Sequence, residues 1–156
     1  MREPKSLASL IFMSIDEINA LHTRMDRVKE EIKFLKANMP NNEEELVEDD
    51  VKRRSIERSV EIALEATLDL ARLIISVKNL PKAQTNSELF DILAENHIIP
   101  HKFADKIRGI GNLRNILVHE YTGIDYEILF ETLKDLEDLE KFVEYIEEFQ
   151  AGNQIE

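Results

Sequence analysis

The chain has 156 residues, a formal net charge of −12 and no cysteine. This length fits one domain, and a chain without cysteine can form neither disulfide bonds nor thiolate metal sites. No apolar run approaches the roughly 20 residues that a membrane-spanning helix needs, so we expect a cytoplasmic protein without membrane contact.

The acidic balance argues against a nucleic-acid-binding protein, because such proteins usually present basic surface. The charge is unevenly distributed, however. The segment from His97 to Arg114 has four basic residues and one acidic residue, whereas the segment from Asp125 to Glu148 has two basic and ten acidic residues. A locally basic site inside an acidic protein is therefore compatible with this sequence.

The first predicted helix runs from about Lys5 to Asn38 and ends near Pro40. Its apolar residues alternate spacings of three and four, a heptad-like pattern; they are Ile18, Leu21, Met25, Val28, Ile32, Leu35 and Met39. Such a face packs either against the rest of its own bundle or against a second copy of the chain. We predict a single domain over residues 1–156, in which residues 1–14 extend the first helix and residues 15–150 form the core.

The second predicted helix starts within the acidic segment Glu43–Asp50 and reaches about Leu80, where Pro81 stops it. A basic group lies near its start, formed by Lys52, Arg53, Arg54 and Arg58. These side chains either form a solvated face that pairs with nearby acids or contact the phosphates of a nucleic acid.

Two more helices are predicted between Pro81 and the acidic end of the chain. A short helix covers Glu88–Asn96, with Ser87 as the expected N-cap. The next has Pro100 in its first turn and ends near Tyr121, before Gly123.

The last predicted helix runs from Asp125 to about Gln150, and no strand-like alternation is found anywhere in the sequence. The pattern therefore predicts an all-α fold, an antiparallel helical bundle of about five helices with a long N-terminal helix.

One stripe of polar side chains on the fourth predicted helix differs from the other helix faces. At about 100° per residue, spacings of four, three and four bring together Arg108, Asn112, Asn115 and His119. Arg114 lies on the edge of this stripe, and Tyr121 follows Arg114 by seven residues. Amides and imidazole are weak helix formers, so the composition is unusual for a solvated face. Gly109 and Gly111 lie just ahead of Asn112, and glycines are places where a helix can kink.

A cation, an amide and an imidazole held close together could bind and cleave a phosphodiester. The guanidinium would stabilise the charge that develops on phosphorus, and a histidine titrates near neutrality and can move protons. The competing interpretation is a polar seam that faces solvent or a neighbouring helix. The histidines at positions 22, 97, 101 and 119 show no metal-ligand spacing on one helix face, so we expect neither a metal nor a cofactor.

The segment Arg114–Tyr121, RNILVHEY, resembles the Arg-x4-His-x-Tyr motif of HepT-type HEPN toxins. The stretch Arg54–Ser76 resembles the second helix of that family, and Leu89–Pro100 resembles its third helix and the following turn. The resemblance covers about Ile15–Phe149, and the motif, the order of the segments and the helix spacing agree together.

The resemblance implies a HEPN-type bundle and a metal-independent endoribonuclease with an RNA substrate such as tRNA or mRNA. Arg114 and His119 would be the core catalytic pair, with Asn115 beside them. They would activate the 2′-hydroxyl of RNA against the neighbouring phosphate and leave a 2′,3′-cyclic phosphate end.

The resemblance also implies two protein partners. The first is a second copy of the chain, since the family forms homodimers whose two motifs face one groove, lined here by the basic stretch of Lys106, Arg108 and Arg114, with Asn112 as a further RNA contact. The second is a minimal nucleotidyltransferase antitoxin, which would transfer AMP to Tyr121 and neutralise the toxin in a type VII-like toxin–antitoxin system.

Two other functions remain open at the level of sequence. One is a non-catalytic HEPN module that binds nucleotides or serves as the accessory subunit of a nucleotidyltransferase, because a fold alone does not fix a function. The other is a helical dimerisation adaptor, suggested by the heptad-like face of the first helix, although that function would leave the polar stripe unexplained.

Overall fold

The computed structural model describes residues 13–119 and 123–152, except for the side chains of Arg114, Val118 and His119. Within these ranges the chain forms eight helices and one antiparallel pair of two-residue strands. The predicted all-α fold is therefore confirmed, with more and shorter helices than the five expected. None of the described helices is long and apolar enough to cross a membrane.

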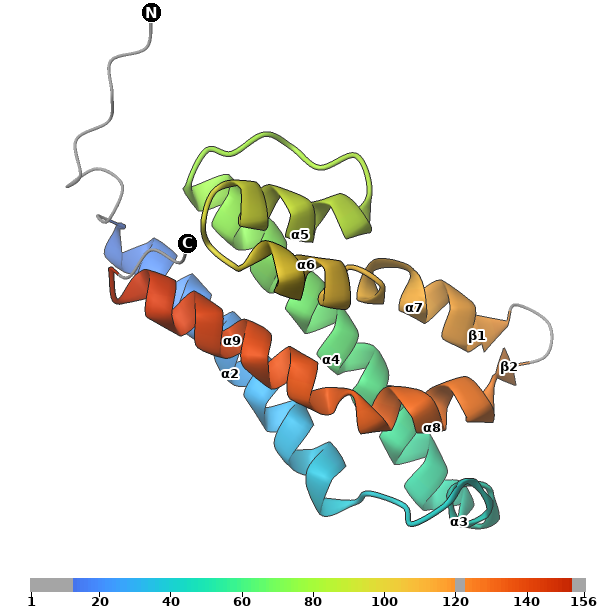
Figure 1. Ribbon diagram of the computed structural model, residues 1–156. Coiled ribbons are helices and arrows are strands. Elements are labelled where there is room, and N and C mark those ends of the chain that lie inside the picture. Colours follow the sequence, from blue (N-terminus) through green and yellow to red (C-terminus); the bar gives the residue numbers. More distant parts are fainter. Residues whose placement is uncertain (1–12, 120–122, 153–156) are drawn as a thin grey trace, which may run out of the picture.

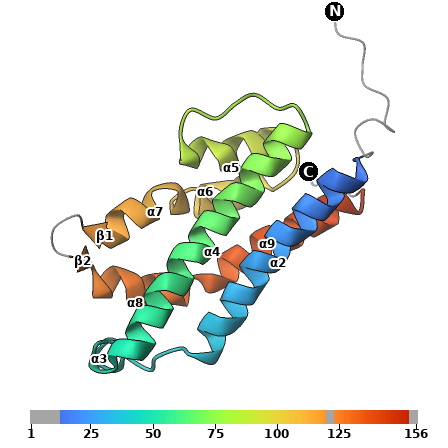
Figure 2. The same cartoon turned by 180° about the vertical axis from the view of Figure 1, so that it is seen from behind.

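Three long helices form the body of the fold: α2 (Ile15–Ala37), α4 (Asp50–Val77) and α9 (Leu136–Gln150). Helix α2 packs against both of the others and runs antiparallel to them (Figures 1 and 2). The short helices within residues 86–117 lie on the side of α4 that faces away from α2 (Figures 1 and 2). This arrangement confirms the antiparallel bundle expected from the sequence.

Helix α2 begins at Ile15, because the Ser14 hydroxyl accepts a hydrogen bond from the Glu17 N–H at 3.1 Å and the backbone of Ser14 is extended. The expected start near Lys5 is thus wrong, and residues 1–12 lie outside the described residues. Most of the heptad-like face is buried within this one chain, namely Leu21, Met25, Val28, Ile32 and Leu35. Packing within its own bundle is therefore the role of that face in the fold.

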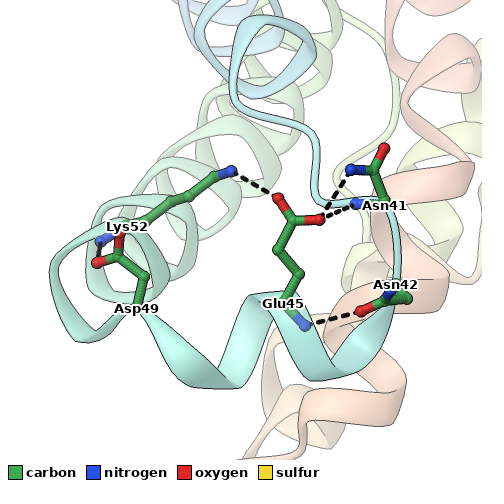
Figure 3. A network of polar contacts seen from close by, with 5 residues as sticks. All are labelled: Asn41, Asn42, Glu45, Asp49 and Lys52. Atoms are coloured by element: carbon green, nitrogen blue, oxygen red, sulfur yellow. Dashed lines mark hydrogen bonds and ion pairs between the residues drawn. The ribbon is translucent and has the colours of Figure 1, made fainter.

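The turn after α2 leads into α3 (Glu43–Glu48), where polar side chains satisfy the free backbone groups (Figure 3). The Asn42 side chain accepts from the Glu45 N–H at 2.8 Å, and the Glu45 carboxylate accepts from the Asn41 N–H at 2.9 Å. That second hydrogen bond is the main reason why the pKa of Glu45 lies below its ordinary value. Asp49 then caps α4, so the predicted second helix is two helices with a break at Asp49.

Helix α4 is 28 residues long and supplies the largest share of the core. Its buried residues are Ile56, Ser59, Val60, Ala63, Leu64, Ala66, Thr67, Leu68, Leu70, Ala71, Ile74 and Ile75. The basic group near its start meets acids of the same chain: Arg53 lies 2.7 Å from Asp50 and Arg58 lies 2.9 Å from Glu61. These pairs agree with the interpretation as a self-paired group. Arg58 is solvated, whereas the Arg53 side chain is only 15% exposed and lies over the Tyr126 ring.

Residues 78–85 form the loop that arches from the end of α4 to α5 (Asn86–Glu95) (Figure 1). The N-cap of α5 is Thr85, not the expected Ser87, because the Thr85 hydroxyl accepts from the Glu88 N–H at 3.3 Å. The Glu88 carboxylate in turn accepts from the Gln84 N–H at 2.6 Å, which completes a capping box.

The acidic end of the chain forms α8 (Tyr126–Lys134) and α9, with a break at Asp135 where one continuous helix was expected. The last turn of α9 lies beside the first turns of α2, where His22 Nε2 is 3.1 Å from Gln150 Nε2. In the core, the Phe142 ring meets the Phe90 ring edge-on, with 5.5 Å between ring centroids. This contact ties α9 to α5 through the interior.

Candidate functional site

The segment expected to be one helix from Pro100 to Tyr121 is two short helices, α6 (His101–Ile107) and α7 (Ile110–Leu117). The chain turns at 108–109, where the Gly111 N–H donates to the Arg108 carbonyl at 3.2 Å. The expected polar stripe from Arg108 to His119 on one helix is therefore wrong. The break falls at Gly109, whose low helix propensity makes it the weakest point of the segment.

Helix α7 ends at Leu117, and the chain continues as two short strands, β1 (Val118–His119) and β2 (Gly123–Ile124). The strands pair antiparallel with His119 opposite Gly123, and the Asp125 N–H donates to the Leu117 carbonyl at 3.0 Å. Gly123 has φ of +83°, a left-handed conformation that glycine adopts without strain. His119 therefore lies on a strand rather than on the predicted helix.

Of the two remaining members of the predicted motif, Arg114 is placed only in part and Tyr121 is not placed. Arg114 lies in the second turn of α7, with its side chain outside the described part of the structure, as is that of His119. Tyr121 lies between the two strands and outside the described residues altogether. The roles predicted for these three side chains stay predictions.

The amides of the predicted stripe do share a surface. Asn112 and Asn115, three residues apart on α7, are both exposed, and Leu117 is buried. Ile116 is a large apolar side chain on the same helix with half of its surface exposed, at 50%. This helix therefore presents polar and apolar groups to solvent along the turn that carries Arg114.

The start of α7 is docked directly on the start of α5. A Cβ atom added to Gly111 would lie 2.7 Å from the Ser87 backbone nitrogen and 2.9 Å from the Asn86 carbonyl carbon. The Ser87 hydroxyl donates to the Arg108 carbonyl at 3.1 Å, and the Asn86 amide donates to the Gly111 carbonyl at 3.4 Å. Only glycine at position 111 allows this approach, which sets the position of the motif helix.

The two cations predicted to contact RNA each meet an acid of their own chain. Arg108 Nη2 lies 3.0 Å from Asp91 Oδ2, and Lys106 Nζ lies 2.9 Å from Asp138 Oδ1. The hydrogen bond to Asp138 is the main cause that raises the pKa of Lys106 above its ordinary value. An RNA phosphate at either cation would compete with these carboxylates.

Two of the predicted RNA contacts, Asn112 and Lys106, border different pockets. Asn112 borders a pocket of about 850 Å³ between the end of α4, the 78–85 loop and the start of α5. Lys106 borders a second pocket of about 400 Å³ between α7 and α8, whose rim includes Glu127, Glu131 and Asp135. Lys106 and Asn112 therefore line two different pockets rather than a common one. Among the described residues, no group of three or more His, Asp or Glu side chains is placed to hold a metal ion.

Comparison with known proteins gives one matching family and several relatives. The model of the family described as "Ribonuclease HepT-like" matches residues 28–146. The mRNA nuclease HepT of Shewanella oneidensis is 32% identical over 83 residues, which are 53% of this chain and 62% of that protein. The tRNA nuclease HepT of Aphanizomenon flos-aquae is 35% identical over 74 residues, which are 47% of this chain and 50% of that protein. These matches therefore span less than two thirds of either relative.

The fold has solved neighbours as well. A tri-AMPylated Shewanella oneidensis HEPN toxin, solved in complex with an MNT antitoxin, superposes with a TM-score of 0.70 at 26% identity. The match covers 86% of this chain and 98% of that one. The arrangement of helices described above is thus shared over nearly the whole length of that toxin.

Proposed function

Because the chain belongs to the ribonuclease HepT-like family, we propose that it is an RNA endonuclease and the toxin of a toxin–antitoxin pair. The observation that carries this proposal is that the family match at residues 28–146 includes the whole segment from Arg114 to His119. The relatives that are named as nucleases of mRNA and tRNA support an RNA substrate. The AMPylated neighbour supports an antitoxin of the nucleotidyltransferase type.

The proposed reaction is an internal transfer at one phosphodiester of RNA. The 2′-oxygen loses its proton to a base and bonds to the adjacent phosphorus. The bond from phosphorus to the 5′-oxygen then breaks, and that oxygen takes up a proton, so the products are a 2′,3′-cyclic phosphate and a 5′-hydroxyl. His119 moves the protons, Arg114 stabilises the additional negative charge on the phosphate, and Asn115 orients it by hydrogen bonding. No step requires water or a metal.

The chemistry is tested with purified protein and a defined RNA in the presence of EDTA. We expect cleavage to persist in EDTA and to fall by at least about 100-fold in His119→Ala, which is the size of a general acid–base contribution. Circular dichroism of the variant controls for folding, and the product ends are mapped for cyclic phosphate. Cleavage by a folded His119→Ala protein at the wild-type rate would refute the assignment. Nucleotide binding without any cleavage by the wild-type protein would instead favour the non-catalytic HEPN module.

We further propose that the active form is a homodimer with α7 at its interface. The exposed Ile116 supports this, because an apolar side chain next to the motif loses its contact with water when a second copy covers it. Two facing copies would also double the number of basic side chains at the groove in an otherwise acidic protein. Light scattering should give the mass of two chains, and Ile116→Asp should shift it toward one chain. A fully active monomer would contradict this proposal.

We also propose that AMP transfer to Tyr121 inhibits the nuclease. A minimal nucleotidyltransferase would use ATP and Mg²⁺, and the Tyr121 phenol oxygen would attack the α-phosphate and release pyrophosphate. Each added AMP brings a negative charge and a base next to Arg114, where both oppose RNA binding. Tyr121→Phe should keep nuclease activity and escape neutralisation. Mass spectrometry after co-expression with the antitoxin that finds no AMP on Tyr121 would disprove this mechanism.

A further inference from the structure

The larger pocket, defined above by the end of α4, the 78–85 loop and the start of α5, has an unusual charge for this chain. Two cations line it, Arg72 and Lys82, and none of its lining residues is acidic. The whole chain has 32 acidic and 20 basic residues, so a wall without a carboxylate departs from the rest of the protein. A pocket of about 850 Å³ lies in the size range of small-molecule sites. Its lining suits an anionic ligand.

The Arg72 guanidinium is held in place at the pocket wall. Its Nη1 donates to Asp69 at 2.7 Å and its Nη2 donates to the Asn86 side chain at 2.8 Å. These contacts use two of the five N–H donors of an arginine and fix the plane of the group. Lys82 lies exposed in the loop and pairs with no carboxylate in the described part of the chain. Arg72, which is paired with Asp69, and Lys82, which has no such partner in the described residues, thus line the same pocket.

The remaining lining offers both apolar contact and hydrogen bonds. Ile75, Leu80 and Leu89 give an aliphatic wall. Side-chain amides, each both donor and acceptor, surround it, namely Asn79, Gln84, Asn86 and Asn112. This combination suits a nucleobase, because its faces are apolar and its edges carry donors and acceptors that amide side chains can pair.

The pocket is physically connected to the motif helix. Asn112 belongs both to the pocket wall and to α7, and the Asn86 amide that receives Arg72 also donates to the Gly111 carbonyl at the start of α7. Asn112 and Asn115 are three residues apart on α7, about 4.5 Å in helix rise, so the pocket borders the helix turn that carries Arg114.

We propose that this pocket binds one nucleotide of a single-stranded RNA substrate next to the scissile phosphate, an inference that rests on the proposed nuclease function. The phosphate meets Arg72 and Lys82, the base lies against the aliphatic wall, and the amides read its edge. The pocket is a substrate-binding site beyond the predicted motif, and it gives the enzyme a base preference at one position beside the cut.

The first test measures RNA binding by the full-length protein. The probe is a fluorescent 12-nucleotide RNA with 2′-O-methyl groups, which cannot be cleaved by 2′-hydroxyl attack. Lys82→Ala should weaken binding about three- to ten-fold and lower the slope of log affinity against log salt by about one. The matched control is Lys33→Ala, which removes an exposed lysine near the C-terminal end of α2. That end of α2 lies away from the 78–85 loop (Figure 2). Gln84→Ala should reduce the difference in affinity between oligo(A) and oligo(U) without changing the salt slope.

The second test uses adenosine 5′-monophosphate and NMR, and it separates the two proposals. We expect the ligand to shift the backbone amide signals of Lys82, Gln84 and Asn86. If the wild-type protein cleaves RNA but Lys82→Ala behaves like Lys33→Ala, the pocket proposal is overturned and the nuclease function stands. If AMP shifts these signals but the wild-type protein neither binds nor cleaves RNA, the nuclease function is overturned and with it the assignment of this pocket to RNA.

Discussion

Helix α4 and the segment that follows α5 differ in how continuous their secondary structure is. Helix α4 runs unbroken for 28 residues, and its buried side chains hold it against α2 and α5. The described residues between His101 and Ile124 form two short helices and two short strands. Buried side chains anchor that segment too, among them Ile107 and Leu117. Polar contacts from Ser87, Asn86 and Asp91 add to its position on α5. We therefore expect stability to depend mostly on the long helices, and activity to depend on how the short elements of the motif are docked.

The largest effect should come from the bundle. Phe142→Ala removes a fully buried ring that contacts Phe90, and it should lower the free energy of unfolding by about 3–5 kcal/mol. Denaturant unfolding measures this loss, with Phe34→Ala on the partly exposed face of α2 as the control. RNA cleavage per folded molecule should stay near the wild-type rate at low temperature. A large loss of activity in the folded fraction would show that the bundle does more than support the motif.

A smaller effect on stability, but a larger one on activity, should come from the docking of α7. Gly111→Ala places a Cβ atom against the α5 backbone, and such overpacking costs about 1–3 kcal/mol. The control is Gly109→Ala, where an added Cβ meets nothing within 4 Å and φ is not left-handed. That change should be neutral or stabilise by up to about 1 kcal/mol. Unfolding and RNA cleavage are measured for both variants, so that the effect of moving α7 is separated from the effect of replacing a glycine. Equal behaviour of the two variants would show that the close contact at Gly111 does not position α7.

The smallest effect should come from the ion pair of Arg108. Asp91→Asn removes a partly exposed carboxylate, so stability should change by less than about 1 kcal/mol. The freed guanidinium should bind RNA phosphate more tightly at low salt, and the gain should disappear at high salt. Asp26→Asn on α2 removes an equal charge from an exposed site away from α7. If both variants raise RNA affinity equally, Arg108 has no specific role.

The sequence predicted the fold wherever packing fixes the backbone. The spacing of three and four residues in α2 identified the residues that are buried, because a long amphipathic helix can bury only the face on which its apolar residues lie. The predicted ends of the helices were less accurate. Ser87 was expected to cap α5, but Thr85 does so through the capping box with Glu88, and Ser87 serves to hold the carbonyl of Arg108.

The candidate site was predicted in composition more than in geometry. Asn112 and Asn115 do share an exposed face, since both lie within α7. His119 was placed on the same helix, because periodicity alone carries no signal for a two-residue strand pair closed at Gly123. The pocket beside Asn112 was missed entirely. All of its described lining residues except Asn112 lie between Arg72 and Leu89, and the pattern of that segment carries no signal that its loop encloses a cavity next to α7.

The contact between His22 and Gln150 has a consequence for how the chain could be rearranged. Because the beginning of α2 and the end of α9 lie side by side, the packing does not dictate the covalent order of the helices. A short flexible linker could join these two ends, and a circular permutant could then be opened between Pro81 and Lys82. All the described helices would remain continuous in that molecule. The 78–85 loop would then be two separate chain ends, and their lengths could be varied without changing a helix.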